Sequence, residues 1–290
     1  MSEEIKNNIK IVDNFLRKIF SKQKKSGLII PMKYGTLTGG KKIRSTIIFN
    51  VAKIFRLKRQ KVVNICAAVE FIHSYSLIHD DLPCMDNDSF RRGKASTHKK
   101  FGESTAILAG NSLLTLAFEI IMDPNYKIEK NKKNLLSKIL AEYAGHTGIA
   151  GGQFLDLSYE KRKKSMSKII DMQKKKTGKL FKFCFLAPAI ISGASKQRIR
   201  EMGSMGEELG LIFQIADDLL DLKGIKKNVG KPVKKDQKKG KSTLIKLMGY
   251  KKTLEFALIR KKMIIGKLKK YGFRSNQLIR TINFILDRSY

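Results

Sequence analysis

Two long apolar segments, residues 62–79 and 205–222, constrain this chain more than any other feature, because each contains or leads into a cluster of three aspartates. The clusters are Asp80, Asp81 and Asp86, and Asp217, Asp218 and Asp221. Apolar residues with helical spacing over this length are typical of helices inside a bundle. Carboxylates so close together repel one another and must be solvated or neutralised. One cluster could be a solvated acidic cap, but two indicate a hard metal ion and an anionic substrate between them.

Helical periodicity dominates the rest of the chain as well. Residues 105–122 and 178–193 predict further apolar helices, and residues 3–20 and 253–270 predict amphipathic ones outside them. The expected connections are residues 35–42, 82–101 and 224–241. With 290 residues, 42% of them hydrophobic, and no linker-like stretch, the chain can form one large core. We predict an all-α fold with a single domain over residues 1–290.

Targeting and redox features favour a cytoplasmic protein. The first residues, MSEEIK, lack the basic start and apolar core of a signal peptide. The longest uninterrupted apolar stretch, residues 183–191, is too short to span a bilayer. Cys66, Cys84 and Cys184 form no CxxC pair or zinc spacing, which predicts reduced packing residues. We therefore expect no membrane insertion.

The formal net charge of +35 allows two interpretations, a nucleic-acid or membrane-surface binder or a generally lysine-rich surface. We favour the second, because the lysines are spread along the whole chain and no RNP pattern or Cys/His finger accompanies them. Residues 240–242 resemble the end of a phosphate loop, but Lys235 stands where that loop requires glycine. GxGxxG, HExxH and GxSxG are absent, which argues against nucleotide hydrolysis, zinc proteolysis and serine esterase chemistry.

The spacing of polar residues suits a site for magnesium and diphosphate. Asp217 and Asp221 are four residues apart, so on a helix they share a face about 5.4 Å apart. Mg²⁺ usually takes one or two protein carboxylates and completes its shell with water and phosphate oxygens. Arg91 and Arg92 follow the first cluster, residues 39–44 combine two glycines with three cations, and His73 lies two helical turns before Asp80.

These motifs together resemble the trans-isoprenyl diphosphate synthase (polyprenyl synthetase) family. Residues 67–120, beginning AAVEFIHSYSLIHDDLPCMDNDSFRRG, are similar to the family's first aspartate-rich region, and GLIFQIADDLLDL is similar to its second. GGKKIR, GGQFLDL, KKKTGKL and GKST follow in the family's order. The most similar subgroup is the bacterial farnesyl diphosphate synthases. The resemblance implies a helical bundle of the isoprenoid synthase type with a central cavity, and a homodimer.

The resemblance also implies the chemistry, which is the magnesium-dependent head-to-tail condensation of isopentenyl diphosphate with dimethylallyl and geranyl diphosphates to farnesyl diphosphate. It implies three Mg²⁺ ions per site, with Mn²⁺ as an alternative, bound by Asp80, Asp81, Asp86, Asp217, Asp218 and Asp221. The implied contacts to the allylic diphosphate are Arg91, Lys176, Thr177, Gln214, Lys231 and Lys241. Those to isopentenyl diphosphate are Lys41, Arg44, His73 and Arg92. Asp80, Asp81, Asp86, Asp217, Lys176 and Arg91 are the expected catalytic set.

Product length is expected to depend on Tyr75 and Ser76, which precede the first cluster. Tyr75 is five residues before Asp80, about 7.5 Å deeper along a helix, where an aromatic ring would block an elongating chain. The alternative is that Tyr75 only packs in the core. The chain departs from the family at Ser45, Ser89, Phe90, 234–236 and Leu244, none of which is a matched metal or diphosphate residue.

Three alternatives remain open from the sequence. A geranylgeranyl diphosphate synthase would make the twenty-carbon product with the same motifs. A class I terpene cyclase would also ionise a prenyl diphosphate, but it needs no isopentenyl site and has a different second metal motif. A non-enzymatic binder or silent subunit is disfavoured, because the acidic clusters are intact.

Overall fold

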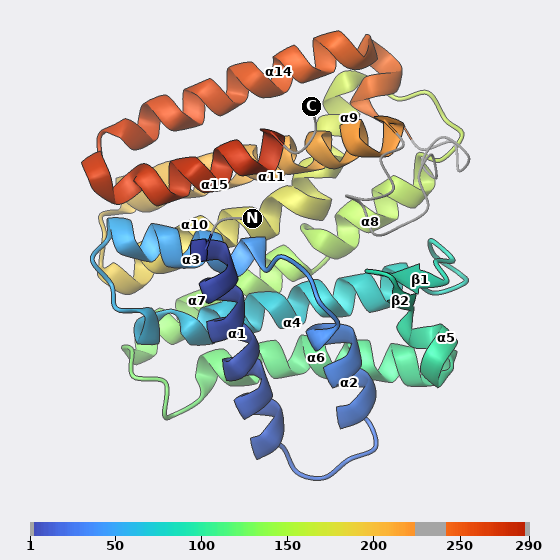
Figure 1. The fold of residues 1–290 in the computed structure, drawn as a ribbon, viewed down its shortest axis with the longest axis vertical. Coiled ribbons are helices and arrows are strands. Elements are labelled where there is room, and N and C mark those ends of the chain that lie inside the picture. Colours follow the sequence, from blue (N-terminus) through green and yellow to red (C-terminus); the bar gives the residue numbers. More distant parts are fainter. Residues whose placement is uncertain (1–2, 224–241, 288–290) are drawn as a thin grey trace. The chain divides into compact units, whose positions relative to one another are not determined.

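The computed structural model describes residues 3–223 and 242–287, and the regular secondary structure in this part of the chain is almost entirely helical (Figure 1). Residues 1–2, 224–241 and 288–290 lie outside the described part, and with them the expected connection 224–241 and the candidate ligands Lys231 and Lys241. The chain divides into two compact units, residues 1–49 with 58–137 and residues 50–57 with 138–290. We call them the first and second unit. The prediction of a single domain stays a prediction.

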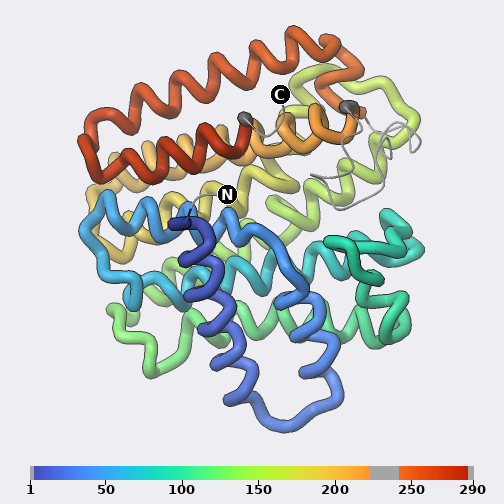
Figure 2. The backbone as a smooth tube through the Cα atoms, viewed as in Figure 1, coloured from blue at the N-terminus to red at the C-terminus, as the bar shows by residue number. Residues whose placement is uncertain are grey.

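The first unit contains the amino-terminal helices and a short hairpin. Figure 2 shows the chain reversing after the first helix and returning as the second. The elements are α1 (Glu3–Lys22), α2 (Ile29–Leu37), most of α3 (Ile43–Ile54), η1 (Arg59–Lys61), α4 (Val63–Asp80), β1 (Phe90–Arg91), β2 (Lys94–Ala95), α5 (Thr97–Phe101), α6 (Glu103–Met122) and the start of α7 (Lys130–Ala144).

The core of the first unit lies between α4 and α6, which pack along each other. Small buried residues of α6, including Ala106 and Ala109, allow this close packing, and Phe20 of α1 meets Phe71 of α4 edge to face at 5.5 Å. Among the described residues, α6 is the one helix long and apolar enough to cross a membrane by length and composition. A core helix of a protein passes the same test, and α6 is packed as one.

The second unit contains the remaining helices. They are α8 (Ile149–Ser158), α9 (Met166–Gln173), the π-helical turn η2 (Lys174–Gly178), α10 (Lys179–Ser192), α11 (Lys196–Lys223), α14 (Leu244–Lys269), η3 (Gly272–Ser275) and α15 (Asn276–Asp287). The most extensive packing joins α10 to α11, where the ring centroids of Phe181 and Phe213 are 5.0 Å apart and the ring planes are tilted by 45°. Helices α14 and α15 run side by side in opposite directions (Figure 1).

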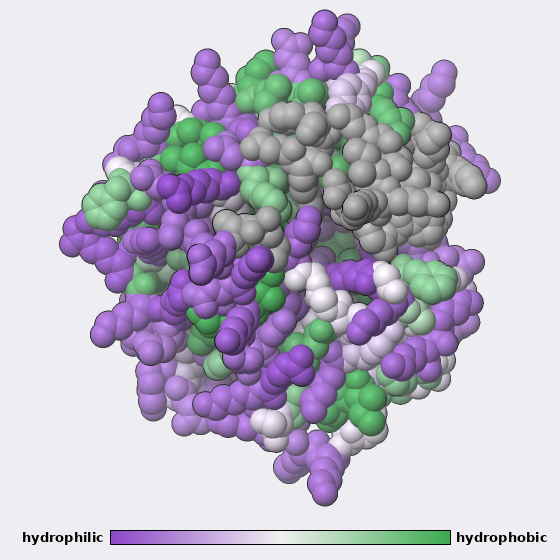
Figure 3. Space-filling view, in the orientation of Figure 1, coloured by the Kyte–Doolittle hydropathy of each residue, from purple (hydrophilic) through white to green (hydrophobic). Residues whose placement is uncertain are grey.

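The prediction of an all-α fold is confirmed, apart from the two-residue strands of the hairpin. All six helices expected from periodicity are present, including α10, which continues through Pro188. The expected connection 35–42 was wrong at its start, because residues 35–37 complete α2. The connection 82–101 holds the hairpin and α5, which periodicity does not detect because both are too short. Figure 3 shows hydrophilic residues over most of the visible surface, as the lysine-rich composition leads one to expect.

Candidate active site

The first aspartate cluster lies at the end of α4. Asp80 is the last residue of that helix and Asp81 caps it. Pro83 follows, and the chain then bends back, because the Asp86 N–H donates to the Asp80 carbonyl at 2.8 Å and the Asp88 N–H donates to the Asp81 carbonyl at 3.0 Å. Asp86 therefore returns toward Asp80 across a short bend.

Arg91 holds the carboxylate of Asp81 from β1. Its Nε donates to both carboxylate oxygens, at 2.9 and 3.1 Å, and a second nitrogen contacts Oδ1. The same guanidinium is 3.5 Å from Asp88, and Asp81 is only 2% exposed. This forked, charge-assisted contact fixes Asp81 in place. Sequence reasoning missed Asp88, although its carboxylate two residues after Asp86 was a visible signal.

The hairpin brings Arg92 to the glycine-rich loop before α3. Arg92 and Gly93 have φ of 53° and 75°, positive at both positions as in a type I′ turn. The Arg92 guanidinium donates to the Gly39 carbonyl at 2.8 Å. It also lies against Gly40, where an added Cβ would be 2.7 Å from its central carbon. Two segments of the predicted isopentenyl diphosphate site thus meet within the first unit.

His73 belongs to the same cationic region. Burial, followed by the positive charges of Arg44, Arg92, Lys42 and Arg91, holds the pKa of His73 well below its usual value. His73 is therefore a neutral imidazole at pH 7, able to donate from one ring nitrogen and accept at the other. Its surroundings suit an anion, although its role stays a prediction.

The neighbouring lysines of the loop have different surroundings. Lys41 is exposed, whereas Lys42 is buried and its Nζ donates to the Thr36 carbonyl at 2.8 Å. Lys42 Nζ also lies 3.6 Å from Glu70 and 3.7 Å from Asp13. Lys42 therefore supports the loop from inside. Glu70, which sequence reasoning missed, also accepts a hydrogen bond of 2.7 Å from Ser45, one of the residues that depart from the family pattern.

Tyr75 and Ser76 lie on α4 as the sequence predicts, one helix turn or more before Asp80. Tyr75 is half-buried and meets the His79 ring edge to face at 5.3 Å. Burial and the charge of Asp80 raise the pKa of the Tyr75 hydroxyl. The Ser76 hydroxyl donates to the His73 carbonyl of its own helix at 2.9 Å. Their influence on product length stays a prediction.

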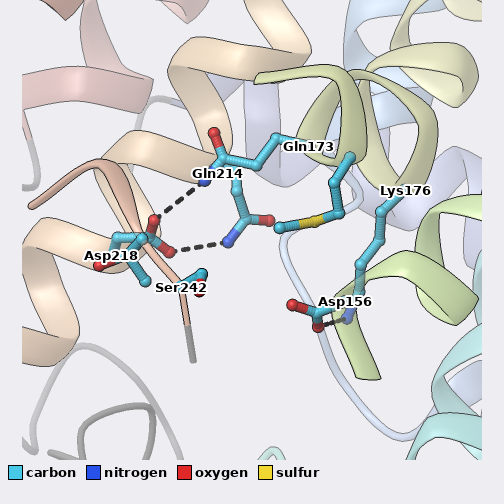
Figure 4. A pocket seen from close by; sticks show the side chains of 8 residues that line it. Asp156, Gln173, Lys176, Gln214, Asp218 and Ser242 are labelled. Atoms are coloured by element: carbon cyan, nitrogen blue, oxygen red, sulfur yellow. Dashed lines mark hydrogen bonds and ion pairs between the residues drawn. The ribbon is translucent and has the colours of Figure 1, made fainter. Parts of the chain in front are cut away.

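The second aspartate cluster lies near the end of α11, in the second unit. Asp217 and Asp221 are both half-buried and one turn apart, as their spacing predicts. Asp218 is buried and accepts two amide hydrogen bonds, one from Gln214 at 2.9 Å and one from Gln173 at 3.2 Å (Figure 4). The Thr177 hydroxyl donates to the side-chain amide oxygen Oε1 of Gln214 at 3.1 Å.

A π-helical turn presents Lys176 and Thr177. Such turns insert an extra residue into a helix and are frequent at functional sites. The turn packs tightly on α8, because a Cβ at Gly152 would lie 2.1 Å from the backbone nitrogen of Lys176. The Lys176 ammonium pairs with Asp156 of α8 at 2.6 Å. Asp156 was not predicted individually, although it lies within the GGQFLDL motif that carried the resemblance.

A small pocket of about 50 Å³, open to solvent, lies among these side chains of the second unit. Figure 4 shows the Gln173 and Gln214 amides meeting Asp218 on one side of the pocket and the Lys176–Asp156 ion pair on the other. Ser242, at its edge, donates to the carbonyls of Tyr159 and Arg162 at 3.2 and 2.6 Å. Those hydrogen bonds fix the chain where α14 begins.

The donor chemistry of both clusters fits Mg²⁺. Carboxylate oxygens are the hard ligands this ion prefers. Among the residues that the structure describes, no three potential ligands converge into a closed metal cage. Mg²⁺ usually takes one or two protein carboxylates and completes its shell with substrate oxygens and water.

Comparison with known proteins gives a consistent result. The polyprenyl synthetase family model matches residues 26–270. The chain is 39% identical to the farnesyl diphosphate synthase of Bacillus subtilis over 82% of this chain and 81% of that protein. A geranyltransferase structure from Legionella pneumophila has a TM-score of 0.89 at 28% identity, covering 98% and 96% of the chains. A Helicobacter pylori geranyltransferase, complexed with magnesium and isoprenyl diphosphate, has a TM-score of 0.83 at 26% identity, covering 99% and 97%. This chain belongs to the polyprenyl synthetase family and is a prenyltransferase.

Proposed function

We propose that this enzyme condenses isopentenyl diphosphate head to tail with dimethylallyl and then geranyl diphosphate, giving farnesyl diphosphate. One observation supports this most: both aspartate clusters and their cationic neighbours are intact in a chain 39% identical to a farnesyl diphosphate synthase. Geranylgeranyl diphosphate remains the less favoured product. A terpene cyclase would not need the cationic loop around Gly39–Arg44.

The allylic diphosphate is held by Arg91, Lys176, Thr177 and Gln214 in this proposal, with Lys231 and Lys241 assigned from the sequence alone. Magnesium ions bound by Asp80, Asp81, Asp86, Asp217, Asp218 and Asp221 would supply Lewis-acid stabilisation of the departing pyrophosphate. Lys176 and Arg91 add positive charge at the same leaving group. Their ion pairs with Asp156 and Asp81 support the proposal, because they hold both cations in defined positions before substrate arrives.

The isopentenyl diphosphate is held by Lys41, Arg44, His73 and Arg92. The carbon–oxygen bond of the allylic partner breaks, pyrophosphate leaves with the electron pair, and an allylic carbocation remains. The double bond of isopentenyl diphosphate attacks that carbon, and a proton is then lost to the released pyrophosphate. The neutral state of His73 supports its role, because the imidazole can donate a hydrogen bond to phosphate without adding to the charge of the crowded arginines.

Product analysis tests this function directly. The enzyme is incubated with isopentenyl and dimethylallyl diphosphates, with Mg²⁺, with Mn²⁺ and with EDTA, and the prenyl products are separated by length. We expect a metal-dependent fifteen-carbon product. Absence of any metal-dependent prenyl product would refute the enzyme, and a dominant twenty-carbon product would refute the farnesyl assignment. A homodimer, three magnesium ions per site and a cytoplasmic location are further parts of the proposal, which sedimentation, metal titration and cell fractionation test.

A further inference from the structure

Gln173 is a buried amide that none of the motifs explains. It is the last residue of α9, immediately before the π-helical turn, and it is only 3% exposed. Its Nε2 donates to Asp218 Oδ2 at 3.2 Å. Its own carbonyl oxygen, Oε1, is buried and accepts no hydrogen bond from the described part of the chain. A buried polar atom left in this state costs free energy, so some other contact must determine how the amide lies.

Asp218 determines the orientation of that amide. An ionised carboxylate only accepts hydrogen bonds, so the NH₂ group of Gln173 must face it. Turning the amide over would place Oε1 against Oδ2, leaving two acceptors in contact and the NH₂ group elsewhere. The Gln173 side chain therefore keeps its hydrogen bond to Asp218, while its own Oε1 accepts no hydrogen bond from the described residues.

A second amide holds the other oxygen of the same carboxylate. Gln214 Nε2 donates to Asp218 Oδ1 at 2.9 Å, and the Thr177 hydroxyl binds the oxygen of Gln214 and fixes that amide in turn. Each carboxylate oxygen has two lone pairs, so neither amide exhausts the oxygen that it binds. Both donors are uncharged. They orient Asp218 through neutral hydrogen bonds, unlike the guanidinium of Arg91 on Asp81.

We propose that Gln173 is a positioning residue that aims the Asp218 carboxylate at Mg²⁺ or at a water bound to it. The inference rests on the proposed function, which makes Asp218 a metal ligand. Hydrogen-bond partners behind a ligand fix its geometry, and losing one typically costs about 10–100-fold in metal affinity.

Substitution Gln173→Met tests this role, because methionine keeps the unbranched length of glutamine and removes the amide. Binding of Mn²⁺ to the full chain is measured by electron paramagnetic resonance, with and without inorganic pyrophosphate. We expect the half-saturating Mn²⁺ concentration to rise about tenfold or more. The reaction rate should recover at high Mg²⁺, which a purely structural defect would not permit. Gln173→Asn, whose shorter side chain cannot reach Asp218, provides a second variant if the first does not fold.

Thr281→Val is the matched control. Thr281 accepts a buried hydrogen bond from Asn50 at 3.0 Å in the same unit and does not line the pocket. Loss of this hydrogen bond should lower thermal stability and leave Mn²⁺ affinity unchanged. An unchanged Mn²⁺ affinity in the Gln173 variants, beside a wild type that binds the ion, would overturn the role of Gln173 alone. A wild type with neither Mn²⁺ binding nor metal-dependent product would overturn the proposed function, and this inference with it.

Discussion

Gly40→Ala should weaken binding of isopentenyl diphosphate specifically, because Gly40 lies directly beneath the Arg92 guanidinium. A Cβ at Gly40 would lie 2.7 Å from the central carbon of that group and 2.8 Å from one of its nitrogens, which is too close for atoms that are not bonded. Gly40 also has φ of 107°, a conformation that alanine rarely adopts. Arg92 must therefore move, and its hydrogen bond to the Gly39 carbonyl must lengthen or break.

Gly39→Ala separates displacement of Arg92 from backbone strain. Gly39 has φ of 68°, and an added Cβ would meet no described atom within 4 Å. Each variant should carry a conformational cost of about 1–3 kcal/mol, but only Gly40→Ala displaces the arginine. The displaced Arg92 should lose a hydrogen bond to the substrate diphosphate. A hydrogen bond to a charged group contributes about 1.5–3 kcal/mol, so the KM for isopentenyl diphosphate should rise roughly tenfold to hundredfold.

The assay is steady-state kinetics with each substrate varied in turn, accompanied by thermal melting of all three proteins. In Gly40→Ala the KM for isopentenyl diphosphate should rise well above that of Gly39→Ala, while the KM for the allylic partner changes little. Equal KM values for isopentenyl diphosphate in the two variants would refute the placement of Arg92 in that subsite.

Three further predictions follow from the described side chains. Arg91→Leu should lower the free energy of unfolding by about 3–5 kcal/mol in urea denaturation, because the buried Asp81 carboxylate loses its partner; an unchanged midpoint would contradict this. Because the pKa of His73 is lowered on folding, the unfolded chain binds more protons as the pH falls below about 6.5, so stability is lost there. His73→Gln should lose less thermal stability than wild type between pH 7.5 and pH 5.5, and equal losses would argue against the lowered pKa. Tyr75→Ala should shift products beyond fifteen carbons in chromatography, and an unchanged distribution would place the limit to growth elsewhere.

The fold was largely predictable because its core helices are long and apolar. Periodicity identifies α4, α6 and α10 within a few residues, since each keeps an uninterrupted pattern over several turns, and it finds the end of α11 but not its start, which is at Lys196 instead of the predicted residue 205. The hairpin at Phe90–Ala95 could not be found in the same way. Its strands have two residues each, and its turn depends on positive φ at Arg92, a residue type that gives no such signal.

The candidate site was predictable where charge clusters along the chain and unpredictable where distant residues supply the partners. Asp80 and Asp81, or Asp217 and Asp218, are conspicuous as neighbours in sequence. Gln173 is not conspicuous, because its amide is 45 residues from Asp218 in sequence and reaches that carboxylate only when α9 packs near α11. Asp156 is similar, since its pairing with Lys176 depends on close contact between α8 and the π-helical turn.

In so basic a chain, buried acids decide which lysines support the structure from inside and which stay at the surface. Lys41 and Lys42 are neighbours of the same type in sequence, and the Lys42 ammonium lies 3.6 Å from Glu70 and 3.7 Å from Asp13. A buried ammonium is expensive without opposite charge, so Lys42 follows the acids inward while Lys41 stays exposed. The chain has 25 acidic residues against 60 Lys and Arg. For these two lysines, the positions of the acids distinguish the buried side chain from the exposed one, which the local sequence does not. Arg91 and Lys176 also pair with carboxylates, but their side chains are 16% and 22% exposed against 2% for Lys42, so exposure as well as pairing separates the proposed substrate-binding cations from the structural one.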